Sequence, residues 1–306
     1  MKEALVCDRF RPLFIYLLLR RGDTKNTILI SNDKFLSNIH YGHFEKVITY
    51  SLSNSKIFVF KIFHNKFQQF KLKLKNSNTL KQINITYGQR HILGMGLFGN
   101  NNIIVIEDGL QDYLEKGTIK DKIRELIFRL PSKESKRVTM TILTGIRYIP
   151  SSIRNPKKIS MTKEWEKLKE YQRRKILEFF NVEDDYLNLI NGSTLLITQP
   201  ISEDKLVNEK EKEQIYLKLV ENNLDNQVLI KPHPRDNTDY SFIKNGVKIL
   251  DKNFPLEIPL LLNIMPKKVV TLYSSVALDF EKSGCELEWY GEDFFSKSHF
   301  YTILKQ

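Results

Sequence analysis

Short apolar runs alternate with helix-like segments along most of this chain, and that alternation restricts the fold more than any other feature. The predicted strands are 4–7, 27–30, 46–49, 102–107 and 138–143, then 194–198, 227–231, 247–250 and 268–272. The predicted helices are 12–20, 110–116, 162–180, 209–221, 257–263 and 275–281. Because a strand–helix–strand order typically forms a parallel pair, each half is predicted to be a parallel sheet covered by helices.

The chain has 306 residues, which is enough for two domains of ordinary size. The strand rhythm is interrupted between Ile149 and Ser193, where two prolines and the long charged helix occur. We therefore predict a first domain over 1–155, a helical crossover over 156–192 and a second domain over 193–306. The Asn- and Lys-rich stretch 61–84 is expected to contain a mobile loop, and 57–60 fits either a strand or a helix.

The formal net charge of +12 indicates an anionic partner, such as a nucleotide donor, an anionic lipid headgroup or a nucleic acid. Positive charge is densest between Lys133 and Lys175, where it forms either a solvated helix face or a membrane-facing surface. Nucleic acid is the least favoured partner, because basic and aromatic residues do not interleave as they do in recognisable nucleic-acid-binding modules.

Neither the cysteines nor the apolar runs indicate an extracellular or membrane-spanning protein. Cys7 and Cys285 lie far apart in apolar segments and are interpreted as reduced core thiols. The apolar run 13–19 is too short to cross a bilayer, and no signal-peptide cleavage site follows it. We expect a cytosolic protein.

The turn after the strand 227–231 carries three groups that can hold positive charge. Lys231, His233 and Arg235 are spaced two apart, with Pro232 and Pro234 between them. Proline ends the strand and stiffens the turn, at the strand end where open α/β sheets bind ligands. The turn suits a phosphate, and His233 could protonate a leaving oxygen. The alternative is a surface histidine without a ligand.

Two further polar clusters follow predicted strands. Glu107, Asp108 and Gly109 place adjacent carboxylates at a tight turn, where one can act as a general base; the alternative for Asp108 is a helix N-cap. Ser274 and Ser275 precede a predicted helix, so they either bind a phosphate at its N-terminus or cap it.

The segment Thr198-Gln-Pro-Ile-Ser-Glu-Asp204 also follows a strand and is expected to line the same site. The chain has no phosphate-binding GxxxxGK[ST] loop and no Asp-x-Asp pair for a nucleotide-bound metal. A metal-independent site built from cationic side chains and a helix terminus fits these absences better.

These clusters, in this order, resemble the bacterial sialyltransferases, and the Lys-Pro-His-Pro-Arg form with Ile-Thr-Gln-Pro upstream most resembles glycosyltransferase family 52, which includes lipooligosaccharide sialyltransferases. The resemblance covers about 103–280. It implies a GT-B fold, in which two Rossmann-like domains with parallel sheets face a central cleft. It further implies a CMP-sialic acid donor, inversion at the anomeric carbon, and neither metal nor cofactor.

The resemblance also implies roles for individual residues. Glu107 or Asp108 would deprotonate the acceptor hydroxyl, with Asp204 as an outside candidate, and His233 would bind or protonate the departing phosphate. The donor contacts assigned to the site are Lys231, Pro234, Arg235, Ser274, Ser275, Gln199 and Gly109.

The implied acceptor is a bacterial cell-surface glycan, such as a lipooligosaccharide or capsule repeat that could be lipid-linked. Peripheral contact with the inner face of the membrane and a homodimer are both compatible with the family. Two alternatives stay open. One is a transferase that uses CDP-glycerol or CDP-ribitol at the same CMP site, and the other is a non-catalytic basic binding protein.

Overall fold

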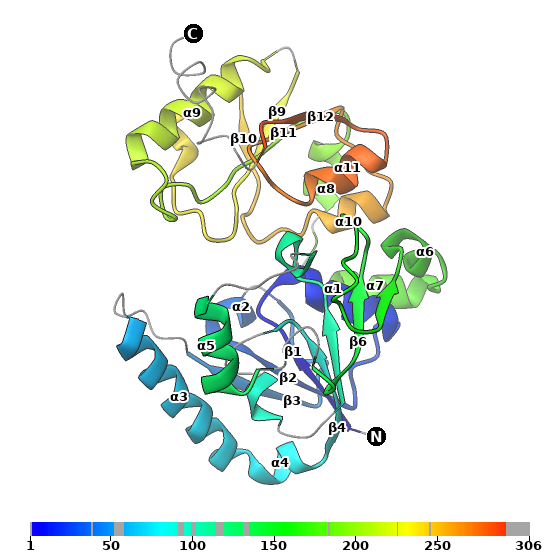
Figure 1. The fold of residues 1–306 in the computed structure, drawn as a ribbon. Helices are drawn as coiled ribbons and strands as arrows, with labels where there is room; N and C mark the ends of the chain where they lie inside the picture. Colours follow the sequence, from blue (N-terminus) through cyan, green and yellow to red (C-terminus); the bar gives the residue numbers. More distant parts are fainter. Residues whose placement is uncertain are drawn as a thin grey trace. The chain divides into compact units, whose positions relative to one another are not determined.

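The computed structural model describes residues 2–291 except 38, 52–57, 91–94, 99–101, 114–118, 131–134, 181, 183, 225 and 245. The chain divides into two compact units, Met1–Asn181 and Val182–Gln306, and each contains one parallel sheet (Figure 1). This arrangement confirms the α/β class that the alternating pattern predicts. The candidate thiols Cys7 and Cys285 are both buried and free.

The sheet of the first unit has the strand order β3-β2-β1-β4-β5-β6-β7, and every neighbouring pair is parallel. Its strands are β1 (Lys2–Val6), β2 (Thr27–Asn32), β3 (Lys46–Tyr50), β4 (Ile83–Gly88), β5 (Asn102–Ile106), β6 (Val138–Leu143) and β7 (Pro156–Lys158). Strands β1 and β2 are buried along almost their whole length, as expected for a parallel sheet with both faces covered.

The helices of the first unit are α1 (Phe10–Leu19), α2 (Asp33–Leu36), α3 (Phe58–Lys75), α4 (Ser77–Lys81), α5 (Ile119–Phe128), α6 (Met161–Glu166) and α7 (Glu170–Glu178). Helix α1 tolerates Pro12 because the first-turn amides of a helix lack intrahelical partners. It ends where Arg21 and Gly22 adopt positive φ angles of 52° and 73°, and the Gly22 amide donates to Leu17 O at 2.9 Å.

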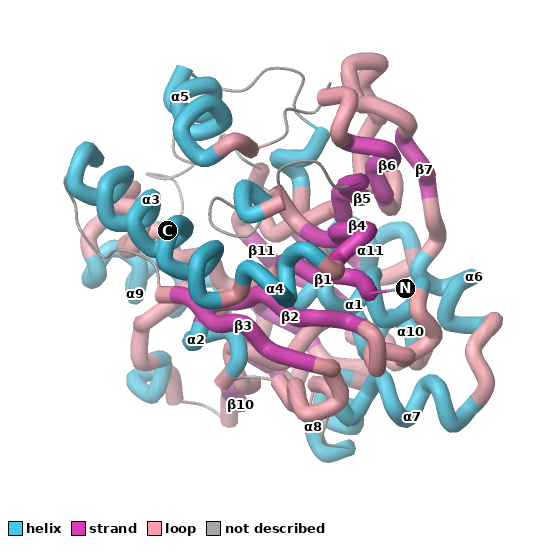
Figure 2. Tube along the Cα trace, turned by 90° about the horizontal axis from the view of Figure 1, so that it is seen from below, coloured by secondary structure: helices cyan, strands magenta, loops and turns pink. Residues whose placement is uncertain are grey.

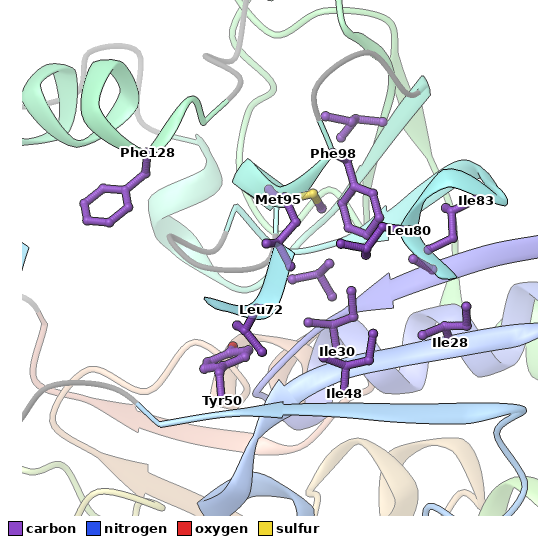
Figure 3. Packing of buried hydrophobic residues seen from close by; sticks show 14 of the residues in the cluster. Ile28, Ile30, Ile48, Tyr50, Leu72, Leu80, Ile83, Met95, Phe98 and Phe128 are labelled. Atoms are coloured by element: carbon purple, nitrogen blue, oxygen red, sulfur yellow. The ribbon is translucent and has the colours of Figure 1, made fainter. Parts of the chain in front are cut away.

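One face of the first sheet packs a core of aliphatic and aromatic side chains (Figure 3). Ile28, Ile30 and Ile48 point from the strands, and Leu72 from α3 and Leu80 from α4 meet them. Burial of this apolar surface is the main favourable contribution to the stability of the unit.

The sheet of the second unit has the order β10-β9-β8-β11-β12, again parallel throughout. Its strands are β8 (Thr194–Ile197), β9 (Val228–Lys231), β10 (Lys248–Ile249), β11 (Lys268–Thr271) and β12 (Glu286–Trp289). Its helices are α8 (Asp184–Ile190), α9 (Glu209–Glu221), α10 (Glu257–Leu261) and α11 (Ala277–Lys282).

Both sheets reverse their strand order once, and this reversal locates a candidate ligand site in each unit. The first sheet grows in one direction from β1 to β3 and in the other from β4, whereas the second reverses between β8 and β11. Open α/β sheets bind ligands outside the carboxyl ends of the strands beside such a reversal. Residues that follow β1, β4, β8 and β11 are therefore well placed for function.

The structure differs from the expectations in several segments. Residues 156–181 belong to the first unit, so the expected crossover 156–192 is divided between the units. The predicted helix 162–180 is two helices, α6 and α7; Trp165 of α6 stacks on Phe14 of α1 with ring centroids 6.4 Å apart. The stretch 61–84, expected to hold a mobile loop, forms α3, α4 and the start of β4. The predicted helix 110–116 is a 3-10 turn over Leu110–Tyr113 and lies outside the described residues beyond that.

The close crossing of β1 and β4 requires glycine at position 88. Gly88 has φ +134°, and a Cβ added there would lie 1.9 Å from Val6 O. We expect Gly88→Ala to lower the free energy of unfolding by at least about 3 kcal/mol, because backbone must shift. Gly192 is the matched control, since its φ of +73° is also positive but its Cβ would meet nothing within 4 Å; Gly192→Ala should cost about 1–2 kcal/mol. Equal costs in urea denaturation would contradict the packing argument.

Candidate functional site

Glu107 follows β5 and is completely buried. Its Oε1 accepts a hydrogen bond from Arg11 Nε at 2.8 Å, and its Oε2 accepts from the Thr144 amide at 2.5 Å and from Tyr113 OH at 2.5 Å. Burial and the Glu107 charge raise the pKa of Tyr113, so this hydroxyl remains a donor. Glu107 therefore ties α1, β6 and the turn after β5 together.

Asp108 is the neighbouring carboxylate and is partly accessible to solvent. Its side chain is 27% exposed, and its Oδ2 lies 3.3 Å from Arg9 Nε. A group that contacts solvent can reach a substrate, whereas the saturated Glu107 carboxylate cannot do so without breaking a buried ion pair. The geometry thus favours Asp108 as the accessible carboxylate, whereas the sequence pattern had offered a helix N-cap as the alternative for that residue.

Asp112 holds the turn that presents Asp108. Its Oδ2 accepts from the Asp108 amide at 2.6 Å and from the Gly109 amide at 3.3 Å. Gly109 has φ +159°, close to extended backbone, and a Cβ there would meet nothing within 4 Å. The tight-turn role expected of Gly109 therefore depends mainly on the carboxylate of Asp112, which sequence reasoning missed.

Sequence reasoning also missed polar groups at the strand reversal of the first sheet. Asp8 follows β1 and accepts hydrogen bonds from Asn32 Nδ2 at 3.1 Å and from Gln89 Nε2, which follows β4. Arg9 comes next and pairs with Asp108. The available signal was topological, because Asp8 and Gln89 become neighbours only once the strand order is known.

His233 lies in the turn after β9 and is half-buried. Its Nδ1 accepts a hydrogen bond from the Arg235 amide at 3.1 Å, and its own amide donates to Thr198 Oγ1 at 3.2 Å. An Nδ1 that accepts leaves the proton of the neutral ring on Nε2. The turn therefore sets both the position and the tautomer of the imidazole.

A fully buried ion pair lies beneath this turn. Lys212 Nζ of α9 contacts Asp236 Oδ1 at 2.7 Å, and both side chains are inaccessible to solvent. Asp236 Oδ2 accepts from Thr198 Oγ1 and from Tyr240 OH, the latter at 2.8 Å. The Thr198 hydroxyl both receives the His233 amide and donates to Asp236. Buried polar groups satisfied in this way hold a single conformation.

Glu203 extends the network to the surface. Its Oε2 lies 2.8 Å from Lys212 Nζ, and its Oε1 accepts from the Asn237 amide at 2.6 Å. Partial burial alone would raise the pKa of this carboxyl, but the hydrogen bonds from Lys212 and Asn237 outweigh it and lower the pKa to about 2. The segment 199–204 is therefore fastened to the histidine turn.

Lys231 and Arg235 take different positions from the shared phosphate site expected of them. Lys231 is buried, and its Nζ donates to the carbonyl oxygens of Pro232 at 2.9 Å and Lys252 at 2.8 Å. Burial lowers the pKa of this amine to about 8 despite nearby carboxylates. It supports the turn from inside. Arg235 is exposed and forms a bidentate pair with Asp204, at 2.7 and 3.0 Å.

Ser274 and Ser275 are half-exposed after β11, on the other side of the strand reversal from β9. Helix α11 begins at Ala277, two residues later than predicted, and its N-cap Val276 supplies no side-chain hydrogen bond. The capping role considered for Ser274 is therefore wrong. The Ser274 amide donates to Thr271 Oγ1 at 3.3 Å.

The remaining donor-site candidates lie on the same carboxyl edge of the second sheet. Gln199 follows β8 and is buried, and its amide donates to Tyr216 OH at 2.6 Å. Pro234 is exposed at the tip of the histidine turn. Tyr273 adjoins Ser274, and burial followed by the charge of Asp204 raises its pKa to about 12. The described loops after β8, β9 and β11 thus gather histidine, arginine, serine and tyrosine.

Within the described residues, no group of three or more His, Cys, Asp or Glu side chains lies close enough together to hold a metal ion. Over the same residues, no helix combines the length and the apolar character needed to cross a membrane.

The fold and these two loop clusters define an α/β protein of the GT-B type, with a polar cluster at the carboxyl edge of each parallel sheet. The model of glycosyltransferase family 52 matches residues 32–286, so the chain belongs to that family. An uncharacterized protein of Haemophilus influenzae is 28% identical over 295 residues, covering 95% of this chain and 94% of that one.

Solved structures of similar fold include two bacterial sialyltransferases. The 2,6-sialyltransferase of Photobacterium sp. JT-ISH-224, in a ternary complex with CMP and lactose, matches with a TM-score of 0.59 and 11% identity over 99% of this chain and 76% of that chain. The α/β-galactoside α-2,3-sialyltransferase of Photobacterium phosphoreum matches with a TM-score of 0.59 and 13% identity over 99% and 94%. At such identities the likeness establishes the shared fold.

Removal of the Thr198 hydroxyl is expected to destabilise the buried network. In Thr198→Val the His233 amide and Asp236 Oδ2 each lose a partner, so the free energy of unfolding should fall by about 1–3 kcal/mol. Thr194 is the matched control, because it is buried at the start of β8, the strand that Thr198 follows, and its hydroxyl has no hydrogen-bond partner in the described structure. Thr194→Val should change stability by less than about 0.5 kcal/mol. Equal effects in urea denaturation would refute the network.

Proposed function

We propose that this family 52 glycosyltransferase is a sialyltransferase that moves sialic acid from CMP-sialic acid to a hydroxyl, with galactose as the acceptor sugar of a bacterial cell-surface glycan. Three findings support the proposal: the family match, the fold shared with sialyltransferases, and the position of His233. The fixed imidazole of His233 is the observation that carries it. Inversion and metal independence belong to the same proposal.

The proposed role of His233 is to assist departure of the CMP phosphate. Sialyl transfer passes through an oxocarbenium-like state in which negative charge develops on that phosphate, and a preorganised donor stabilises the developing charge. The neutral imidazole carries its proton on Nε2, because Nδ1 accepts the Arg235 amide. Nε2–H can therefore donate a hydrogen bond to a phosphate oxygen and stabilise the negative charge that develops there as the glycosidic bond breaks.

Other groups at this edge are proposed to hold the donor. The half-exposed Ser274 and Ser275 can donate hydroxyl hydrogen bonds to the phosphate, with Gln199 and Pro234 lining the site. Arg235 can contribute its charge, which its bidentate pair with Asp204 orients. Lys231 is proposed as a support of the turn instead of a phosphate ligand, because its amine is committed to two carbonyl oxygens.

Asp108 is the proposed general base, and Glu107 is proposed to position it. A base must come within hydrogen-bond reach of the acceptor hydroxyl, and of the two carboxylates Asp108 has the accessible side chain. Arg9 beside Asp108 favours the ionised carboxylate that a base requires. Glu107, through Arg11 and Thr144, fixes the strand end from which Asp108 projects.

The acceptor and the cellular location are part of the same proposal. A lipid-linked acceptor would bring a cytosolic enzyme to the inner face of the membrane as a peripheral protein, and the family is compatible with a homodimer. The CDP-polyol alternative uses the same phosphate chemistry but is less favoured, because the chain matches a family of glycosyltransferases. The non-catalytic alternative is disfavoured for the same reason.

Donor turnover is the direct test. Purified protein with CMP-sialic acid, lactose and EDTA should release CMP and form sialyllactose, whereas CDP-glycerol should release none. His233→Ala should lower the turnover number by at least about 100-fold, because loss of one preorganised donor to the developing negative charge costs that much or more. His64→Ala, on the exposed side of α3, should retain full activity. Release of CMP from CDP-glycerol alone would show that the transferred group is glycerol phosphate and not sialic acid.

Separate substitutions should distinguish the two carboxylates. Asp108→Asn should lower turnover by at least about 100-fold while leaving the KM for CMP-sialic acid and the free energy of unfolding nearly unchanged. Glu107→Gln should instead destabilise the fold by about 3–5 kcal/mol, because Arg11 loses its buried partner. Full turnover in Asp108→Asn would eliminate it as the base and direct attention to Asp204.

A further inference from the structure

Helix α3 presents its most apolar side to solvent. Phe60, Phe63, Phe67, Phe70 and Leu74 are each 55 to 70% exposed. Their spacings of three, four, three and four residues place them on one helix face, within an arc of about 80° at about 100° per residue. Figure 1 shows α3 running along the outside of the first unit. We call these five side chains the phenylalanine stripe.

The opposite side of α3 packs against the first unit and is unusually polar. Asn65, Gln69 and Asn76, the residue after α3, are buried there together with Leu72. Gln69 Nε2 donates to Phe128 O at 3.3 Å, and Lys66 Nζ donates to Ile127 O at 2.7 Å, which fastens α3 to the end of α5. A surface helix normally buries its apolar stripe and exposes amides. Helix α3 packs Leu72 and part of Ile62 against the core but exposes its larger apolar face, so the phenylalanine stripe is not part of the core of the unit.

Positive charge borders the stripe on both sides. Lys73 follows one flank, and Lys71 and Lys75 follow the other, whereas the amine of Lys66 is directed to Ile127 O and Gln69 Oε1. Lys71 Nζ lies 4.7 Å from the centroid of the Phe67 ring, so its stem covers part of the apolar surface. No acidic residue occurs between Glu45 and Glu107, and the charge of this surface is therefore unopposed by its own segment.

We propose that the phenylalanine stripe is the face by which this protein docks on an anionic membrane surface. A helix that lies in the membrane interface typically has aromatic rings on one face and lysines beside them. The rings enter the boundary of the acyl chains, and the amines reach the lipid phosphates. A second copy of this chain would fit the apolar area, but it would bring lysine rows against each other. Anionic headgroups have the complementary charge.

The proposal locates membrane contact on a different surface from the basic stretch between Lys133 and Lys175. In that stretch Lys167 pairs with Glu164 and Arg174 pairs with Glu170, so part of its charge is paired along α6 and α7. The docking surface involves none of the groups assigned to sialyl transfer. The docking proposal does not depend on which donor the enzyme uses, and its test does not require knowledge of the acceptor.

The test uses the full chain and lipid vesicles. Wild-type protein should sediment with vesicles of phosphatidylcholine and phosphatidylglycerol, less with phosphatidylcholine alone, and less again as salt is raised. Phe63→Gln, Phe67→Gln and Phe70→Gln combined should lower the vesicle partition coefficient by at least about tenfold, since three rings lose their apolar environment. Lys71→Gln, Lys73→Gln and Lys75→Gln combined should remove the preference for anionic lipid.

The matched control removes exposed aromatic rings elsewhere. Tyr148 and Tyr171 are 84% and 65% exposed, and Tyr171 lies on the basic helix α7, so Tyr148→Gln with Tyr171→Gln should bind vesicles like the wild type. Circular dichroism and turnover with a soluble acceptor should be unchanged in the phenylalanine variant. Wild-type protein that ignores anionic vesicles would overturn the proposal. So would a wild-type dimer that the phenylalanine variant converts to a monomer, without vesicle binding by either.

Discussion

The buried ion pair between Lys212 and Asp236 is the interaction on which the candidate donor site depends. Removing two charges from water costs free energy, and that cost is offset only when the remaining hydrogen-bonding positions of both groups are satisfied. Asp236 meets this condition through Thr198, Tyr240 and the Thr238 amide, the last at 3.0 Å. Because Thr198 follows β8 and Asp236 follows β9, one carboxylate fixes the segments that leave two adjacent strands. His233 gains its fixed position between them.

In the first unit, a different buried ion pair fixes the end of a strand. Glu107 and Arg11 are buried together, and the Thr144 amide and hydroxyl complete the carboxylate shell. In both units the buried carboxylate lies within three residues of the accessible group proposed to act, Asp108 in one and His233 in the other. A fixed buried residue close in sequence restricts the position of the accessible side chain, as a catalytic group requires.

Much of the fold was predictable because strand and helix periodicity are local. Strand Val138–Leu143 and helix Glu209–Glu221 match their predicted bounds. Strand β12 was missed because its alternating Glu and apolar residues resemble a surface segment, and part of α3 was expected to hold a mobile loop because the stretch 61–84 was judged by its Asn and Lys content. The Glu-Asp-Gly and His-Pro clusters were found because they follow strands. Arg11 and Lys212 were not, since each lies far along the chain from its carboxylate partner.

The net charge of +12 illustrates a further limit of sequence reasoning. Composition gives the amount of charge, and a linear map favours the stretch where lysines and arginines are densest. Electrostatic attraction to a surface depends instead on the charge left after local pairing. Along α6 and α7 glutamates pair with the cations, whereas the lysines of α3 border exposed phenylalanine rings and have no acidic residue nearby in sequence. A helix that turns five large apolar side chains to solvent also bears a hydration cost, which a partner surface would remove. Charge and exposed apolar area coincide on α3, and that coincidence, more than the count of cations, identifies the surface.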